Sequence, residues 1–175
     1  MKERILPHYT YDDRLHWEEG WELIDGFAYS LYSSSEPNHQ RISANVVTEF
    51  GLSLNGCNKY VSYRSIDYWI KDDTILQPDM LIVSGEITKK YLDFPPALIA
   101  EIRTPATAYN DRHAKYAIYE SQGVKYYIII APDKEEVEIY ELLDGEYRLK
   151  QSGKDIVHEF FFPECTARVD FKEIW

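Results

Sequence analysis

The run from Val124 to Ile130 places the tightest limit on how this chain can fold. It is almost wholly apolar, whereas a strand with one face in water alternates apolar and polar residues. The run therefore predicts a central strand that is buried on both faces of a sheet. Gly123 stands just before it, where glycine is typical of a helix end, and we expect that helix to run from a cap at Thr107 to Gln122.

Two Asp-Gly pairs lie between apolar and aromatic runs, which is the local pattern of a tight β-hairpin because both turn positions tolerate a positive φ. Asp25-Gly26 predicts strands at 21–24 and 27–32, and Asp144-Gly145 predicts strands at 137–143 and 147–150. Further strands are expected at 60–70, 74–83 and 97–103, with an added edge strand in the tail from Ile156.

The longest expected helix begins at Glu36, with Ser35 as its cap and Pro37 in its first turn, and it stops at Asn55-Gly56. Its buried stripe is predicted by apolar residues at four-residue steps, namely Ile42, Val46, Phe50 and Leu54. Shorter helical stretches are expected at 11–19 and 86–91. With no linker or repeat in sight, we expect residues 1–175 to form a single α/β domain, a mixed central β-sheet flanked by helices and carrying added β-hairpins.

The formal net charge of −11 argues against a broad nucleic-acid surface, because Lys and Arg supply most of the affinity for phosphate. Any contact with DNA or RNA would need a local basic patch, for which we single out four residues near the acids described below. These are Arg103, Arg112, Lys115 and Lys125.

The two cysteines, Cys57 and Cys165, are far apart and have no Cys or His at metal-ligand spacing, so we expect free thiols in a reducing compartment. The first residues lack the apolar stretch of a signal peptide, and no run is long enough to span a bilayer. We therefore expect a cytoplasmic protein without a membrane partner.

Two acids stand in or beside strand-like runs: Asp79, directly after Pro78, and Glu101. If the two strands are neighbours, both carboxylates can face one site and hold a hard cation such as Mg²⁺, which prefers oxygen ligands. Asp79 has a plainer interpretation as a turn cap. For Glu101 the alternative is an ion pair with Arg103 or Lys115, because a buried carboxylate needs a partner.

The helix that follows offers Asp111 and Lys115, four residues apart on one face, so Lys115 can reach back toward the carboxylates. A solvated salt bridge on the helix surface would explain this pair equally well. His39 is more typical of a capping or packing residue than of a base. Glu22 either completes a metal shell through water or lies in solvent.

The ordered set of these residues resembles the Uma2 (DUF820) family within the PD-(D/E)XK nuclease superfamily. The resemblance rests on the opening hairpin 21–26, a Ser-rich turn and a helix with His39, the acidic strand 75–83, Glu101-Ile102-Arg103-Thr104-Pro105, Asn110-Asp111-Arg112, Lys115, Tyr119, and Gly123 to Tyr127. It implies a restriction-endonuclease-like core over most of the chain.

The same resemblance implies that Asp79, Glu101 and the backbone carbonyl of Ile102 hold Mg²⁺ or Mn²⁺. The superfamily usually has a lysine two residues after the glutamate, but this chain has Arg103 there, and arginine cannot act as a base because it stays protonated. Lys115 takes the lysine's place, and with Arg103 it would stabilise charge on the phosphate. The base stays unassigned.

The function that follows is metal-dependent hydrolysis of phosphodiester bonds in DNA by an endonuclease. A homodimer is expected, because duplex cleavage suits a two-fold pair. The alternative is an inactive nuclease-fold protein that binds a nucleic acid or another protein. A two-carboxylate glycosidase is a weaker interpretation, because nothing in the sequence identifies a sugar cleft.

Overall fold

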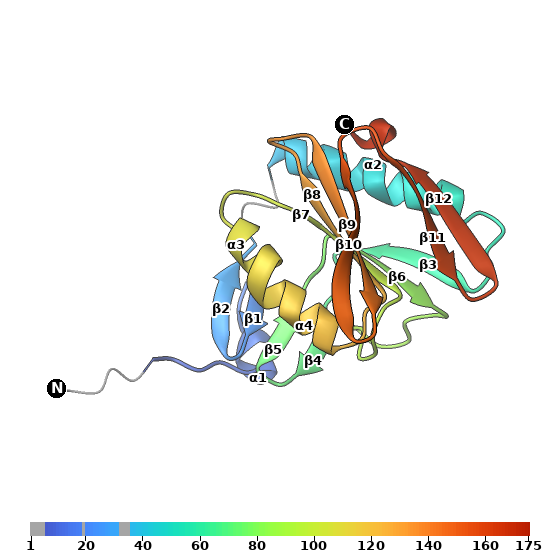
Figure 1. Cartoon of the computed structure of the whole chain (residues 1–175). Coiled ribbons are helices and arrows are strands. Elements are labelled where there is room, and N and C mark those ends of the chain that lie inside the picture. Colours follow the sequence, from blue (N-terminus) through green and yellow to red (C-terminus); the bar gives the residue numbers. More distant parts are fainter. Residues whose placement is uncertain (1–5, 19, 32–35) are drawn as a thin grey trace.

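A six-stranded mixed sheet forms the centre of the computed structural model, which describes residues 6–18, 20–31 and 36–175 (Figure 1). Its strand order is β10-β9-β8-β7-β6-β3, and only β7 and β8 pair in parallel. The strands are β3 (Tyr60–Arg64), β6 (Met80–Ser84), β7 (Leu98–Ile102), β8 (Tyr126–Ala131), β9 (Glu136–Leu143) and β10 (Glu146–Gly153). All residues of β8 are buried, which confirms the predicted central strand.

One face of this sheet is covered by α2 (Pro37–Ser53) together with a C-terminal hairpin, β11 (Val157–Phe162) and β12 (Cys165–Asp170). The expected stripe of α2 is buried, and its Phe50 packs against Phe160 and Phe171. Phe171 begins a short 3₁₀ helix that ends at Ile174. We had expected the C-terminal segment to add an edge strand to the central sheet. It instead forms a separate hairpin that completes one half of the core.

The other face is covered by a helical segment made of α3 (Ala108–Asn110), a π-helical turn (Asp111–Lys115) and α4 (Tyr116–Ser121). Gly123 follows at φ +78°, a conformation that favours glycine and that confirms the predicted helix end. Thr107 stands at the start of the segment, but its side chain does not cap it and instead bonds with Thr104. A layer of tyrosines lies between these helices and the sheet.

A second, smaller sheet has the order β2-β1-β5-β4. It contains the first predicted hairpin, β1 (Trp21–Ile24) with β2 (Phe27–Ser30), and two strands from the middle of the chain, β4 (Tyr68–Lys71) and β5 (Thr74–Leu76). Figure 1 shows it beside the helical segment and next to the N-terminal α1 (Tyr11–Arg14). The second predicted hairpin, β9 with β10, is also confirmed.

Two long strands expected from the sequence are in fact divided between the two sheets. The run 60–70 breaks at Ser65, whose φ of +51° interrupts an extended backbone, so that β3 and β4 part there. The run 74–83 breaks at Pro78, which cannot donate to a strand ladder, so that β5 and β6 part there. The chain thus crosses from one sheet to the other directly before Asp79.

Some smaller expectations also need correction, and others concern residues that the structure does not describe. Of the helix expected at 11–19, the described residues form only the single turn of α1. Residues 86–91 form no helix: 86–88 have no regular structure and 89–91 are bends. The proposed cap Ser35 and the end of the strand at 27–32 fall outside the described residues. Within the ranges that the structure describes, no helix combines the length and apolar character needed to cross a bilayer.

The expectation of two free thiols is wrong, because Cys57 and Cys165 form a disulfide with their Cα atoms 5.8 Å apart. The packing of the C-terminal hairpin on α2 brings the loop after α2 next to the first residue of β12. Nothing in the sequence indicated this proximity, because the two cysteines are 108 positions apart in the chain. The cysteines therefore no longer support a reducing compartment.

Removing this cross-link should destabilise the protein. A disulfide that closes so long a loop restricts the unfolded chain, so we expect Cys57→Ser with Cys165→Ser to lower the free energy of unfolding by about 2–4 kcal/mol. Urea unfolding without reductant measures the difference. Dithiothreitol should reproduce it in the wild type and leave the double variant unchanged; equal midpoints for the two oxidised proteins would contradict the prediction.

Candidate active site

Asp79 and Glu101 are brought together by the pairing of β6 with β7. The two strands are antiparallel with Met80 opposite Ala100, so Asp79 before Met80 faces Glu101 after Ala100. Both side chains line one pocket, together with His39, Asp111 and Lys115. The convergence expected from the sequence is therefore present, and four separate elements contribute to it.

Lys115 lies at the centre of the charged groups and is only 2% exposed. Its Nζ is 3.0 Å from Oε1 of Glu22, 3.1 Å from Oε1 of Glu101 and 3.5 Å from Oδ1 of Asp111. Burial alone would lower the pKa of Lys115, but the carboxylates of Glu101, Glu22 and Asp111 outweigh burial and raise this pKa well above its usual value. Near neutral pH Lys115 is therefore an ammonium and not a base.

The pair Asp111 and Lys115 is not the solvated helical salt bridge that the sequence also allowed, since both residues are buried. They stand at the two ends of the π-helical turn, a rare conformation that is frequent at functional sites. Glu22 is not in solvent either: it is 3% exposed and its Oε1 accepts a hydrogen bond from the backbone N–H of Gln77.

Glu101 is held by two donors that reach the same oxygen. Its Oε1 accepts a hydrogen bond of 2.7 Å from the hydroxyl of Tyr119 and one of 3.1 Å from Lys115. Burial raises the pKa of Glu101 well above its usual value; Lys115 opposes this shift, while Asp111 and Asp79 add to it. The structure thus supports the ion pair with Lys115 and not one with Arg103.

Asp79 is fixed at the point where the chain leaves Pro78 and enters β6. Its Oδ2 accepts a hydrogen bond of 2.7 Å from the backbone N–H of Ile102 and lies 3.2 Å from Nε2 of His39. His39 is therefore part of the site and not a cap of α2. Ile102, whose carbonyl we expected as a metal ligand, also lines the pocket.

The pocket holds more acid than base. The carboxylates of Glu22, Glu101 and Asp111 lie within 3.5 Å of Nζ of Lys115, and Asp79 lines the same pocket as Glu101, Asp111 and Lys115. Both carboxylate oxygens of Asp111 are buried without a well-formed hydrogen bond to the described chain, and burial raises the pKa of Asp111. This excess of hard oxygen donors suits a divalent cation.

A metal site is not fully preassembled, however. Among the described residues, no three His, Cys, Asp or Glu side chains are arranged to hold an ion together. Mg²⁺ does not require such a cage, because it commonly binds through one or two carboxylates and keeps several waters. The donors around Asp79 and Glu101 therefore fit the ion that the sequence led us to expect.

The four cations singled out in the sequence do not form a basic patch. Lys115 is buried. Arg103 forms an ion pair of 3.0 Å with Asp133 and not with Asp79 or Glu101. Arg112 forms two hydrogen bonds with Glu138, and Lys125 donates to the carbonyl of Phe161. This expectation is therefore wrong, because local acids already neutralise the arginines.

Sequence reasoning gave Tyr119 no role of its own, although it contacts Glu101 directly. A signal was present in its spacing: Asp111, Lys115 and Tyr119 recur at steps of four residues, which places them on one helical face toward the sheet. The supporting contact of Gln77 to Glu22 carried no such signal, because it depends on how β1 packs against β5.

The raised pKa of Glu101 predicts how stability depends on pH. The unfolded chain releases this proton near the ordinary value of 4.5 and the folded chain only at higher pH, so the folded state binds more protons in between. The free energy of unfolding of metal-free protein should therefore fall as pH rises from about 4.5 through the folded pKa.

Urea unfolding in EDTA across a pH series measures this fall, and Glu101→Gln should make it shallower. Glu159→Gln removes the same charge at an exposed position and serves as the matched control. A profile in Glu101→Gln as steep as that of the wild type would show that another group causes the dependence.

Comparison with known proteins shows which proteins this chain resembles. A solved structure described as a putative nuclease belonging to DUF820, from Anabaena variabilis, superimposes with a TM-score of 0.73 over 94% of this chain and 96% of its own, at 16% sequence identity. An uncharacterized protein of Synechocystis sp. is 25% identical over 143 residues, which cover 77% of this chain and 75% of the relative.

The structural likeness, at this level of identity, establishes a shared fold of mixed α/β architecture. The family is established by sequence: the model described as "Uma2: Putative restriction endonuclease" matches residues 10–170. That range includes every residue placed in the pocket above. The chain belongs to the Uma2 family of restriction-endonuclease-like nucleases.

Proposed function

We propose that this protein is a metal-dependent endonuclease that hydrolyses phosphodiester bonds in DNA. The observation that carries the proposal is the convergence of Asp79 and Glu101 on one pocket, beside the buried ammonium of Lys115. The Uma2 family and the fold of the DUF820 nuclease support the reaction class. The metal and the DNA substrate are our inference from the family together with the acids of the site.

Asp79, Glu101 and the carbonyl of Ile102 would hold Mg²⁺ or Mn²⁺. Such an ion, when bound, polarises a phosphoryl oxygen and ionises a water molecule near neutral pH. Because Lys115 and Tyr119 both engage Oε1 of Glu101, the other carboxylate oxygen of Glu101 would be the ligand. Asp79 is held in place for its role by the N–H of Ile102.

Lys115 would stabilise the negative charge that develops on the phosphate. Glu22 and Asp111 fix the direction of its side chain and keep it protonated, so no rearrangement is needed during the reaction. We had expected Arg103 to share this role, but Asp133 engages its guanidinium, and we therefore assign the role to Lys115 alone.

A homodimer and a cytoplasmic location complete the proposal. We propose a homodimer because a two-fold pair of sites suits cleavage of both strands of a duplex. We propose a cytoplasmic location because the DNA substrate is found inside the cell. The disulfide between Cys57 and Cys165 is the observation that opposes a cytoplasmic location, because disulfides persist mainly in oxidising compartments.

A non-catalytic binding protein is the second candidate function. It is favoured by the lack of a preassembled group of three metal ligands among the described residues and by Arg103 at the position of the usual lysine. Calorimetric titration with Mn²⁺ separates the two candidates. Binding that Asp79→Asn removes supports the enzyme, whereas no heat of binding supports the second function.

Substitution of either metal-binding acid should abolish cleavage. Charge stabilisation by a metal is worth several kcal/mol, and about 1.4 kcal/mol is a factor of ten in rate, so Asp79→Asn and Glu101→Gln should each reduce nicking of plasmid DNA in Mg²⁺ at least about 100-fold. Asp133→Asn provides the control outside the pocket. Nicking that survives both acid substitutions would exclude the proposed site.

Tyr119 should act as a positioning residue. Tyr119→Phe removes one hydrogen bond to the Glu101 carboxylate, worth about 1.5–3 kcal/mol for a charged acceptor, so kcat should fall roughly 10-fold or more with KM little changed. The Mg²⁺ concentration for half-maximal rate should rise with it. Loss of stability at an unchanged metal dependence would instead assign Tyr119 a purely structural role.

A further inference from the structure

Among the described residues, positive charge without an ion-pair partner is found on α2 and at the end of β3. The exposed guanidinium of Arg41 binds Oδ1 of Asn38 at 2.8 Å, and that of Arg64 binds Oε1 of Gln40. Both acceptors are neutral amides, and no carboxylate of the described residues forms an ion pair with either arginine. Their charges therefore remain available to an anion. The charges of Arg103 and Arg112 do not, because they are paired with Asp133 and Glu138.

These two arginines, which we call the basic rim, are close in the chain to residues of the acidic pocket but do not line the pocket themselves. Arg64 directly precedes Ser65, and Arg41 lies two residues after His39; both Ser65 and His39 line the pocket. Ser65 holds a φ of +51°, a strained conformation for a residue with a side chain, and such strain tends to be kept at functional positions. The turn at Ser65 directs the chain away from β3 and leaves Arg64 at the strand end.

The N-terminus of α2 adds to this positive field. The helix is 17 residues long and begins at Pro37, its N-cap Glu36 makes no side-chain capping bond, and its first turn contains no acid. The first backbone N–H groups of a helix have no partner within it, and the helix dipole places partial positive charge there. Helix N-termini are common binding sites for phosphate.

His39 gives independent evidence for a ligand at this end of the pocket. It is the third residue of α2, is only 5% exposed, and lines the pocket. Its Nε2 faces Asp79, but its Nδ1 is buried without a hydrogen-bond partner in the described chain. Buried polar atoms are nearly always satisfied, so this nitrogen calls for a polar ligand atom or a bridging water.

We propose that the first turn of α2, with Arg41, Arg64 and His39, is a subsite for a backbone phosphate that flanks the bond to be cleaved. The inference rests on the proposed function, since it names the part of the protein that grips the nucleic acid. It explains how a chain with a net charge of −11 binds a polyanion: few phosphates are contacted, and only at this rim. The dependence of affinity on salt should accordingly be shallow, with about two counterions released.

Binding of a short fluorescein-labelled DNA oligonucleotide, followed by fluorescence anisotropy in Ca²⁺, tests the subsite. Arg41→Gln with Arg64→Gln should raise Kd about 10-fold and reduce the slope of log affinity against log salt by about 1–2. Arg41→Lys with Arg64→Lys keeps the charge and should retain most of the affinity. Both arginines are exposed, so the folded state should persist in each variant.

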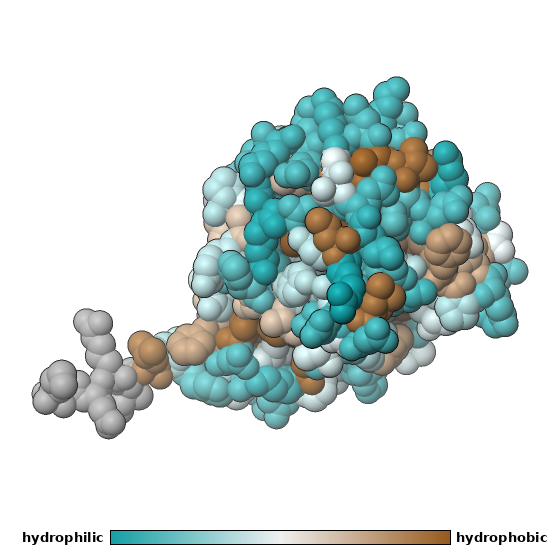
Figure 2. Space-filling view, viewed as in Figure 1, coloured by the Kyte–Doolittle hydropathy of each residue, from teal (hydrophilic) through white to brown (hydrophobic). Residues whose placement is uncertain are grey.

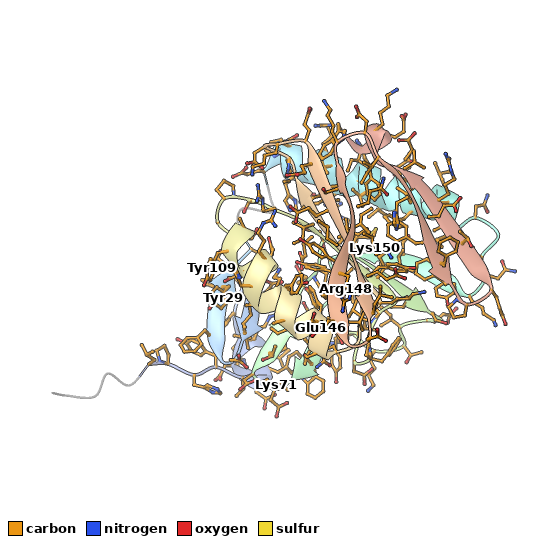
Figure 3. All side chains as sticks on the ribbon, in the orientation of Figure 1. Tyr29, Lys71, Tyr109, Glu146, Arg148 and Lys150 are labelled. Carbon is orange, nitrogen blue, oxygen red and sulfur yellow. A yellow bond between two sulfur atoms is a disulfide. The ribbon has the colours of Figure 1, made fainter. Side chains whose placement is uncertain are left out.

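A matched control removes the same number of charges elsewhere. Arg148 and Lys150 belong to β10, at the sheet edge opposite β3, and are paired with Glu146 and Glu141 (Figure 3). Arg148→Gln with Lys150→Gln should leave Kd within about two-fold, because these charges are remote from the phosphate.

An equal loss in both double variants, no loss in the first, or no binding by the wild type would each overturn the subsite. Binding that depends on Arg41 and Arg64 supports it whether or not DNA is cut. If such binding is found and no nicking occurs in Mg²⁺ or Mn²⁺, the subsite stands and the nuclease proposal fails.

Discussion

The ammonium of Lys115 is the group on which the arrangement of the pocket depends. Its Nζ contacts carboxylates from β1, β7 and the π-helical turn, so one buried cation ties the small sheet, the central sheet and the helical segment together. Removing one partner of a buried ion cluster leaves an uncompensated charge, which is far more destabilising than the cluster is stabilising. The geometry of the acids is therefore strongly coupled to the packing of three elements.

The electrostatics of the molecule are unusual for a protein that acts on DNA. The face seen in Figure 2 is largely hydrophilic, with apolar residues in small separate patches, and the chain as a whole is acidic. Repulsion from this surface would keep a polyanion at a distance except where charge is locally reversed. An acidic body with a confined basic rim favours a few defined contacts over sliding along a duplex.

Much of the framework follows from local pattern. The apolar run of β8, the four-residue steps of α2 and the Asp-Gly hairpins were predicted correctly because each depends on residues close in sequence. The division of two long strands between two sheets was not predicted. The strands part at Ser65 and Pro78 because the residues on either side pair in different sheets, and such pairing is not visible in the local sequence. The pairing of Asp79 with Glu101 was foreseen because the acids lie on adjacent strands.

The rest depended on contacts that no local pattern encodes. Arg103 forms an ion pair with Asp133, which lies on the turn after β8. The two cysteines form a disulfide because the last hairpin packs on α2. The π-helical turn was equally invisible, although Asp111 and Lys115 were both recognised as candidates. In each case we had singled out the residue from the sequence, but its contacts depend on tertiary packing.

The contact between Glu22 and Lys115 also bears on how the chain is assembled during synthesis. The first strand of the small sheet is synthesised before the helical segment that carries its cationic partner, and its neighbour β5 follows only after α2, β3 and β4 in the chain. Contacts between residues so distant along a chain generally slow folding. The charged cluster can therefore close only after the chain has been synthesised as far as Lys115, and a nascent protein has no complete pocket before that point.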